Sequence, residues 1–74
     1  MTKLPVVSGA DAIRAFSRIG YEVDRQRGSH VILRNAAPPF RRLVVPNHKV
    51  LAKGTLRSLI REAGLTPDEF AALL

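Results

Sequence analysis

The spacing of apolar residues changes at Gly20, and this change limits the folds open to the chain. Before Gly20, apolar residues recur at helical spacing from Ala12 to Ile19, and Ser8 is a natural N-cap for that helix. After Gly20, residues 21–26 alternate with the two-residue period of a strand. A helix leading straight into a strand, in a chain of 74 residues, indicates one small domain of mixed secondary structure.

The remainder of the chain predicts two more strands and two more helices. Residues 29–35 and 41–46 are rich in apolar and β-branched residues, and a loop with two prolines separates them. Residues 56–63 place apolar side chains at i, i+3, i+4 and i+7, which predicts a helix with one buried face. Thr66 and Pro67 begin a short last helix. The residues of that helix that we expect to be buried are Phe70, Leu73 and Leu74.

The predicted order is α-β-β-β-α with a short C-terminal helix, an α+β fold in one domain spanning residues 1–74. Ser8 with Asp11, and Thr66 with Glu69, have the spacing of capping boxes and predict where two helices start. A three-stranded antiparallel sheet with the helices packed on one face buries the apolar stripes. This packing leaves the other sheet face open to solvent or to a partner.

The length of the first hairpin loop determines which face His30 occupies. We interpret residues 27–29 as a three-residue loop, which pairs Gln26 with His30 and Val23 with Leu33. The positions facing the helices are then Tyr21, Val23, Val31 and Leu33. The open face carries His30, Ile32 and Arg34, with His30 near the turn beside Arg25 or Arg27. We expect Tyr21 and the three phenylalanines in the core, so no aromatic platform for stacked bases is indicated.

The net charge of +6 is concentrated in the middle of the chain. Between Asp24 and Lys53 the only acid is Asp24, and elsewhere bases and acids balance. The basic residues of this stretch are Arg25, Arg27, Arg34, Arg41, Arg42, Lys49 and Lys53. A localised positive field suits a polyanion, and we expect these side chains to bind RNA phosphates. The alternative is a basic surface that only aids solubility.

What the sequence lacks argues against several classes of function. It has no cysteine, its two histidines are eighteen residues apart, and Gly28 and Gly54 each stand alone. Thiol chemistry, a metal-dependent nuclease and a phosphate-cradling kinase or hydrolase are therefore disfavoured, and we expect no metal and no cofactor. We also expect a cytoplasmic protein, since no secretory signal and no apolar run of roughly 18–20 residues is visible.

Metal-free cleavage of RNA remains open to such a chain. The RNA supplies its own 2′-hydroxyl nucleophile, so the protein needs only proton transfer and stabilisation of charge on phosphorus. His30 can transfer a proton, and Arg25 or Arg27 can stabilise the charge. Ser29 can donate a hydrogen bond or belong to the turn, and His48 can complement His30 or be an exposed loop residue. His30 itself can instead be a structural residue or a phosphate contact.

The chain resembles the HicA (YcfA-like) mRNA interferase toxins along nearly its whole length. The matching segments are "KLP" at 3–5, "SGADAIRAFSRIGYEV" at 8–23, "RQRGSH" at 25–30, "VVPNH" at 44–48 and "KGTLRSLIREAGL" at 53–65. The resemblance implies a double-stranded-RNA-binding-domain-like fold and a ribonuclease that cleaves mRNA and halts translation. It also implies the toxin role in a type II toxin–antitoxin system, with a HicB antitoxin that masks the active site.

The resemblance also assigns roles to the two histidines. The catalytic histidine of the family's G-S-H motif falls on His30, and the histidine after the third strand falls on His48 as an auxiliary group. Two other interpretations remain beside this one. A non-catalytic basic module would bind RNA by shape and phosphate contacts, and a protein-interaction domain would show no steep salt dependence of RNA binding.

Overall fold

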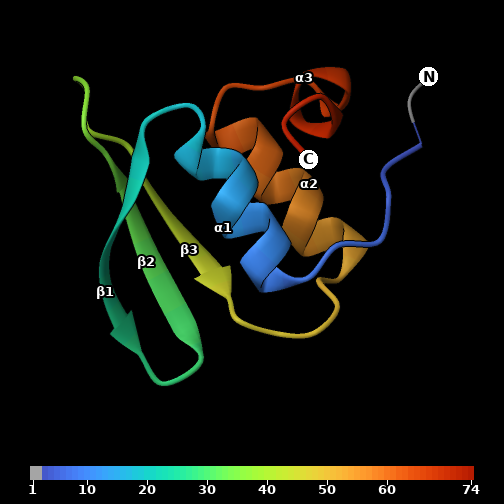
Figure 1. The fold of residues 1–74 in the computed structure, drawn as a ribbon, viewed down its shortest axis with the longest axis horizontal. Helices are drawn as coiled ribbons and strands as arrows, with labels where there is room; N and C mark the ends of the chain where they lie inside the picture. The colour runs from blue at the N-terminus through green and yellow to red at the C-terminus, as the bar shows by residue number, and fades with distance from the viewer. Residues whose placement is uncertain (1–2) are drawn as a thin grey trace.

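The computed structural model describes residues 3–74 and has the predicted order of elements (Figure 1). The elements are α1 (Gly9–Ser17), β1 (Tyr21–Arg27), β2 (His30–Asn35), β3 (Arg42–Pro46), α2 (Lys53–Glu62) and α3 (Pro67–Ala71). The strands form one antiparallel sheet in the order β1-β2-β3, and all three helices lie on one side of it. The predicted α+β fold is confirmed. Met1 and Thr2, which the predicted domain range includes, lie outside the described residues.

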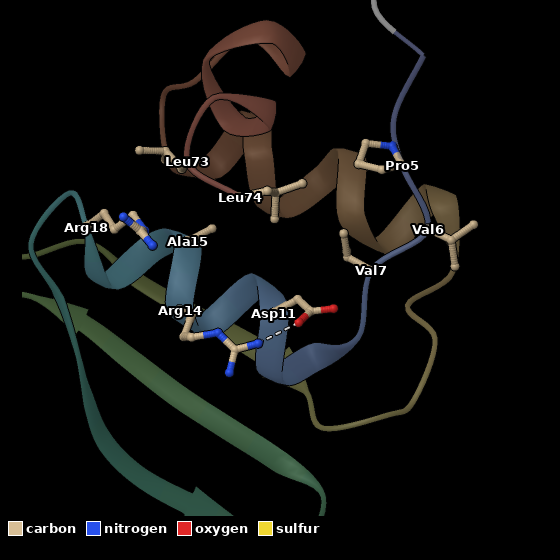
Figure 2. Close-up of a pocket in the computed structure, with 9 residues that line it drawn as sticks. All are labelled: Pro5, Val6, Val7, Asp11, Arg14, Ala15, Arg18, Leu73 and Leu74. Atoms are coloured by element: carbon tan, nitrogen blue, oxygen red, sulfur yellow. Dashed lines mark hydrogen bonds and ion pairs between the residues drawn. The ribbon is translucent and has the colours of Figure 1, made fainter.

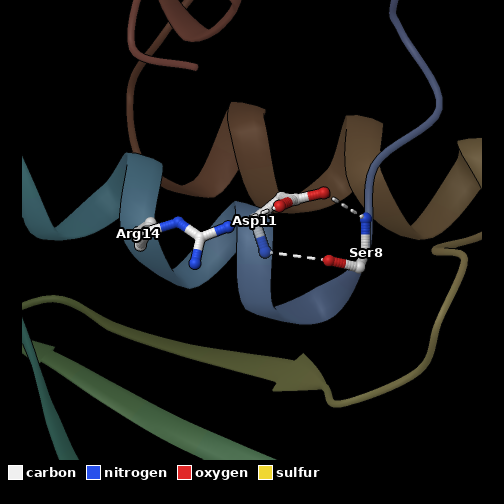
Figure 3. Close-up of polar contacts among 3 residues, drawn as sticks. All are labelled: Ser8, Asp11 and Arg14. Carbon is white, nitrogen blue, oxygen red and sulfur yellow. Dashed lines mark hydrogen bonds and ion pairs between the residues drawn. The ribbon is translucent and has the colours of Figure 1, made fainter.

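Both predicted capping boxes are present. The Ser8 hydroxyl accepts from the Asp11 backbone N–H at 3.0 Å, and the Asp11 carboxylate accepts from the Ser8 N–H at 3.1 Å (Figure 3). Thr66 and Glu69 make the same reciprocal pair at the start of α3, at 3.1 and 2.8 Å. These bonds satisfy backbone donors that have no partner within the helix. Gly20, with φ of +98°, then turns the chain from α1 into β1.

The core lies between the helices and the sheet. Phe16 of α1 and Phe70 of α3 are fully buried, with ring centroids 5.3 Å apart. Burying one such side chain stabilises the fold by roughly 1.5–3 kcal/mol. Apolar residues from every element complete this cluster: Tyr21, Val31, Leu33, Leu43, Val45, Leu56, Leu59 and Ile60. The helices therefore hold β2 and β3 firmly from one side.

Three residues expected to be buried are exposed, and two of them, Leu74 and Phe40, lie outside the sheet. Leu74 is 50% exposed because α3 ends at Ala71 and the chain runs past the packed part of that helix. Phe40 is 43% exposed because it lies in the β2–β3 loop, outside the helix-covered area.

The predicted register of the first hairpin is correct at one end and wrong at the other. Val23 pairs with Leu33 as expected, but His30 pairs with Arg27, not with Gln26. The turn therefore holds only Gly28 and Ser29, and a glycine with φ of +57° at its first position is the type II′ pattern.

A bulge at Asp24 reconciles the two ends of this hairpin. The extra residue falls between Val23 and Arg25 and shifts the pairing by one position. Without it, a two-residue turn would reverse the faces of the residues near Tyr21. Val23 shares the face of Leu33 yet is 58% exposed, contrary to expectation. The reason is that β1 is an edge strand in which only Tyr21 lies beneath the helices.

Candidate functional site

The face of the sheet that the helices leave uncovered presents three cross-strand rows. Alternation along β2 and β3 buries one set of side chains and directs the other set outward. The outward rows are Arg27–His30–Pro46, Arg25–Ile32–Val44 and Glu22–Arg34–Arg42. We call these nine residues the open face. His30 lies in the row nearest the hairpin turn, directly beside Arg27, as the sequence predicts.

The open face is basic around an apolar centre. Its four arginines are all exposed, and Glu22 is its one acidic residue. Val44 is 50% exposed, and Ile32 beside it is partly buried. A polyanion that lies across this face meets positive charge at both ends of the sheet.

Three separate segments meet beside His30. Pro46 is the β3 partner of His30, and the next residue, Asn47, donates its backbone N–H to the Ser29 carbonyl at 2.6 Å. The Gly9 N–H at the start of α1 donates to the His48 carbonyl at 2.8 Å. The hairpin turn, the end of β3 and the start of α1 thus converge at one end of the sheet. The two histidines, eighteen residues apart in sequence, both belong to this end.

The other residues predicted to bind RNA are divided by the fold. The Arg41 guanidinium donates to the Glu62 carbonyl, at 3.4 Å, at the end of α2. Arg41 is therefore directed to the helix side and is not part of the open face. Lys49 is exposed in the β3–α2 loop, close in sequence to His48, and Lys53 is the first residue of α2. Ser29 lies in the turn, where its carbonyl oxygen is already bonded.

One residue of this region was not expected to be at the surface. The ring of Phe40 lies 4.8 Å, measured to its centroid, from the guanidinium carbon of Arg34. This distance is within the range of a cation–π contact. A sequence signal existed, because Phe40 stands in a proline-containing loop outside every apolar periodic segment.

A hollow of about 270 Å³ lies elsewhere, between α1 and both ends of the chain (Figure 2). Its lining includes Val7, Leu73 and Leu74, together with the ion pair of Arg14 and Asp11 at 2.7 Å. Figure 2 shows Val7, Leu73 and Leu74 on the side of α1 away from the sheet. The hollow is therefore not continuous with the open face.

Neither a metal site nor a membrane-spanning helix is found among the described residues. Residues 3–74 contain no group of three or more histidine, cysteine, aspartate or glutamate side chains placed to hold a metal ion. No described helix has the length and apolar character needed to cross a membrane. The chemistry that the open face offers is an exposed imidazole beside guanidinium groups. Such a set can exchange a proton and bind a phosphate.

Comparison with models of protein families identifies a relationship. A family model described as "HicA toxin of bacterial toxin-antitoxin" matches residues 9–65. The matched segment runs from the start of α1 past the end of α2, so it contains the whole sheet, His30 and His48. No curated protein matches the chain.

Proposed function

The chain belongs to the HicA toxin family of bacterial toxin–antitoxin systems, and from that premise we propose that it is an endoribonuclease that cleaves mRNA and stops translation. The observation that supports this proposal most directly is the exposed imidazole of His30 in one cross-strand row with Arg27. Three further arginines extend the same surface. An RNA phosphate held by these guanidinium groups would lie within the positive field beside the imidazole.

The proposed reaction uses the 2′-hydroxyl of the RNA as the nucleophile. His30 acts as a general base or acid, either taking the proton from that hydroxyl or giving one to the departing 5′-oxygen. Arg25 and Arg27 stabilise the additional negative charge on the phosphate in the transition state. The new bond joins the 2′-oxygen to phosphorus, and the bond to the 5′-oxygen breaks. The products are a 2′,3′-cyclic phosphate and a free 5′-hydroxyl, and DNA cannot react because it lacks the nucleophile.

The second proton-transfer group is assigned to His48, and Ser29 is a further auxiliary candidate. His48 is supported by the convergence at the end of the sheet, where its backbone is bonded to Gly9 and its neighbour Asn47 to Ser29. We assign phosphate binding to the other basic residues near this surface: Arg34, Arg42, Lys49, Lys53 and Arg41. Arg41 has the weakest support because it is bonded to α2.

The proposed partner is a HicB-like antitoxin protein. Its action would be to cover the open face, since His30 and the arginines around it are all exposed there. We further propose that residues 1–74 form one domain that acts in the cytoplasm without a cofactor. The alternative function is a non-catalytic RNA-binding module. It is favoured by the composition of the open face, which has four arginines that can bind phosphate but only one histidine that can transfer a proton.

Replacement of His30 tests the proposal. Purified parent protein should cut single-stranded RNA in the presence of a chelator, and His30→Ala should lose at least about 100-fold in rate, the usual contribution of a general acid or base. RNA ends and growth arrest on expression are the measurements, and circular dichroism checks the fold. His48→Ala is the matched histidine control and should lose less if His30 is the principal group.

Two results would contradict this assignment. Cutting by His30→Ala at the parent rate would reject the mechanism. Salt-sensitive RNA binding by the parent, with no new RNA ends and no growth arrest, would favour the non-catalytic module.

A further inference from the structure

Phe40 differs from the other aromatic residues of the chain in being at the surface. Its side chain is 43% exposed, whereas Phe16, Tyr21 and Phe70 are buried. Leaving an aromatic ring in water forfeits the stabilisation that burial would provide. The ring therefore contributes little to the core, and its position calls for another role.

The backbone of Phe40 is in a conformation that bulky residues rarely adopt. Its φ is +59°, in the left-handed region, and it is the only residue other than glycine with positive φ among the described residues. Glycine or asparagine would occupy this position at lower cost. Unfavourable backbone conformations of this kind persist where the surrounding structure holds them and are concentrated at functional sites.

Hydrogen bonds on both sides fix the loop that carries this ring. The Phe40 N–H donates to the Ala37 carbonyl at 2.8 Å, and the Asn35 N–H donates to the Arg41 carbonyl at 2.8 Å. Arg41 is in turn bonded to the end of α2. The ring is thus positioned before any ligand arrives, which reduces the entropy lost on binding.

The surroundings of Arg34, which the ring contacts, suit a nucleobase beside the phosphate assigned to this arginine above. Arg34, which lies against the Phe40 ring, also lines a hollow of about 290 Å³ together with Glu22 and Asp24. The two carboxylates make this hollow less positive than the rest of the open face, and they can accept hydrogen bonds from the amino groups of a base. By contrast, no acidic residue stands in the rows of Arg25 and His30.

Building on the function proposed above, we propose that the Phe40 ring, held against Arg34, is a stacking surface for an unpaired nucleobase of the RNA strand. Phe40 contacts Arg34, four residues along β2 from His30, which corresponds to about 13 Å at about 3.3 Å per residue. One RNA strand lying along β2 reaches both positions. The base stacks at Phe40 while the phosphate to be cut lies at His30, so the enzyme selects single-stranded RNA, whose bases are free to stack.

The test measures RNA binding separately from cutting. All proteins carry His30→Ala so that the RNA stays intact, and the probe is a single-stranded RNA oligonucleotide containing 2-aminopurine, whose fluorescence falls on stacking. Phe40→Leu should weaken binding by about 5- to 150-fold, the usual contribution of one stacked base, and should abolish the fall in fluorescence. Phe40→Tyr keeps an aromatic ring and should therefore keep both the RNA affinity and the fall in fluorescence. Val6→Ala is the control for loss of an exposed apolar group, since Val6 is 75% exposed and lies in the N-terminal segment.

Each outcome bears on the inference directly. Unchanged binding and fluorescence in Phe40→Leu would overturn it, as would an equal loss of affinity for duplex RNA. Unchanged RNA binding together with loss of antitoxin neutralisation would assign the ring to a protein partner and also overturn it. The chain with His30 intact is assayed for cutting in parallel. If that chain binds RNA without cutting it, the proposed enzyme activity fails, while the Phe40 comparison still decides the stacking surface.

Discussion

Gly9 is the residue at which the first helix comes closest to the segment that follows β3. Its N–H is bonded to the His48 carbonyl. A β-carbon at this position would collide with the Pro46 carbonyl oxygen and would lie 2.9 Å from the Asn47 α-carbon. The close approach of two backbones, not a left-handed conformation, is what requires glycine here. The same contact holds His48 at the end of the sheet where His30 lies.

Gly9→Ala should therefore be destabilising. The added methyl group must displace backbone, which typically costs about 1–3 kcal/mol. Urea unfolding measures the change. Gly54→Ala is the matched control, because a β-carbon there meets nothing within 4 Å and alanine is the better helix former by up to about 1 kcal/mol. Equal stability of the two variants would show that the close approach at Gly9 does not constrain the fold.

Helix α1 owes its starting point to one charged capping box. The pKa of Asp11 is held below its ordinary value of 3.8, mainly because its carboxylate accepts from the Ser8 backbone N–H, then through the Ser8 hydroxyl and the neighbouring Arg14. The ionised carboxylate is thus favoured in the folded protein. Its contribution to stability is present above the ordinary pKa and is lost as the pH falls through the lowered value.

Asp11→Asn should make this pH dependence visible. At neutral pH the variant should be less stable than the parent, and the gap should close as the pH falls below 3.8. Urea unfolding at several pH values is the measurement. Ser8→Ala, which removes an uncharged cap at a cost of about 1 kcal/mol, should keep most of its deficit in acid. A gap for Asp11→Asn that stays constant with pH would show that the charge of Asp11 is not involved.

The molecule as a whole separates a helix-covered side from an exposed basic side. Four arginines stand on the open face, while Arg57 and Arg61 are exposed on α2, on the other side of the sheet. Net charge alone would attract RNA to both sides equally. If the open face is the binding site, arginines on that face contribute more to RNA affinity than arginines on α2.

Replacing single arginines distinguishes attraction of RNA by net charge from binding of RNA at the open face. Arg25→Gln or Arg27→Gln should weaken RNA binding and should lower the slope of log affinity against log salt by about 0.7, the value for one lost contact to a single strand. Arg57→Gln changes the net charge equally and should leave the slope nearly unchanged. Affinities over a range of salt concentrations give the slopes. The same loss in all three variants would mean that RNA is attracted by net charge and not bound at the open face.

Much of the fold was predictable because it depends on neighbours in the sequence. Both capping boxes, the end of α1 near Gly20 and the apolar stripe of α2 follow from interactions within a few residues. The outward position of His30 was predicted correctly although the three-residue loop behind that prediction was wrong, because Val31 and Leu33 are buried on the opposite face of β2. The predicted burial of Leu74 was wrong, because the apolar spacing of the sequence continues beyond Ala71, where α3 ends.

The sequence by itself determined the order of elements, the capped starts of α1 and α3 and the concentration of positive charge between Asp24 and Lys53, since each is local or compositional. Only the tertiary structure decided the two-residue turn with its bulge at Asp24 and the direction of Arg41 toward α2. It alone revealed that Phe40 lies against Arg34 at the surface. These features depend on contacts between segments far apart in the chain, where packing and register override local preference.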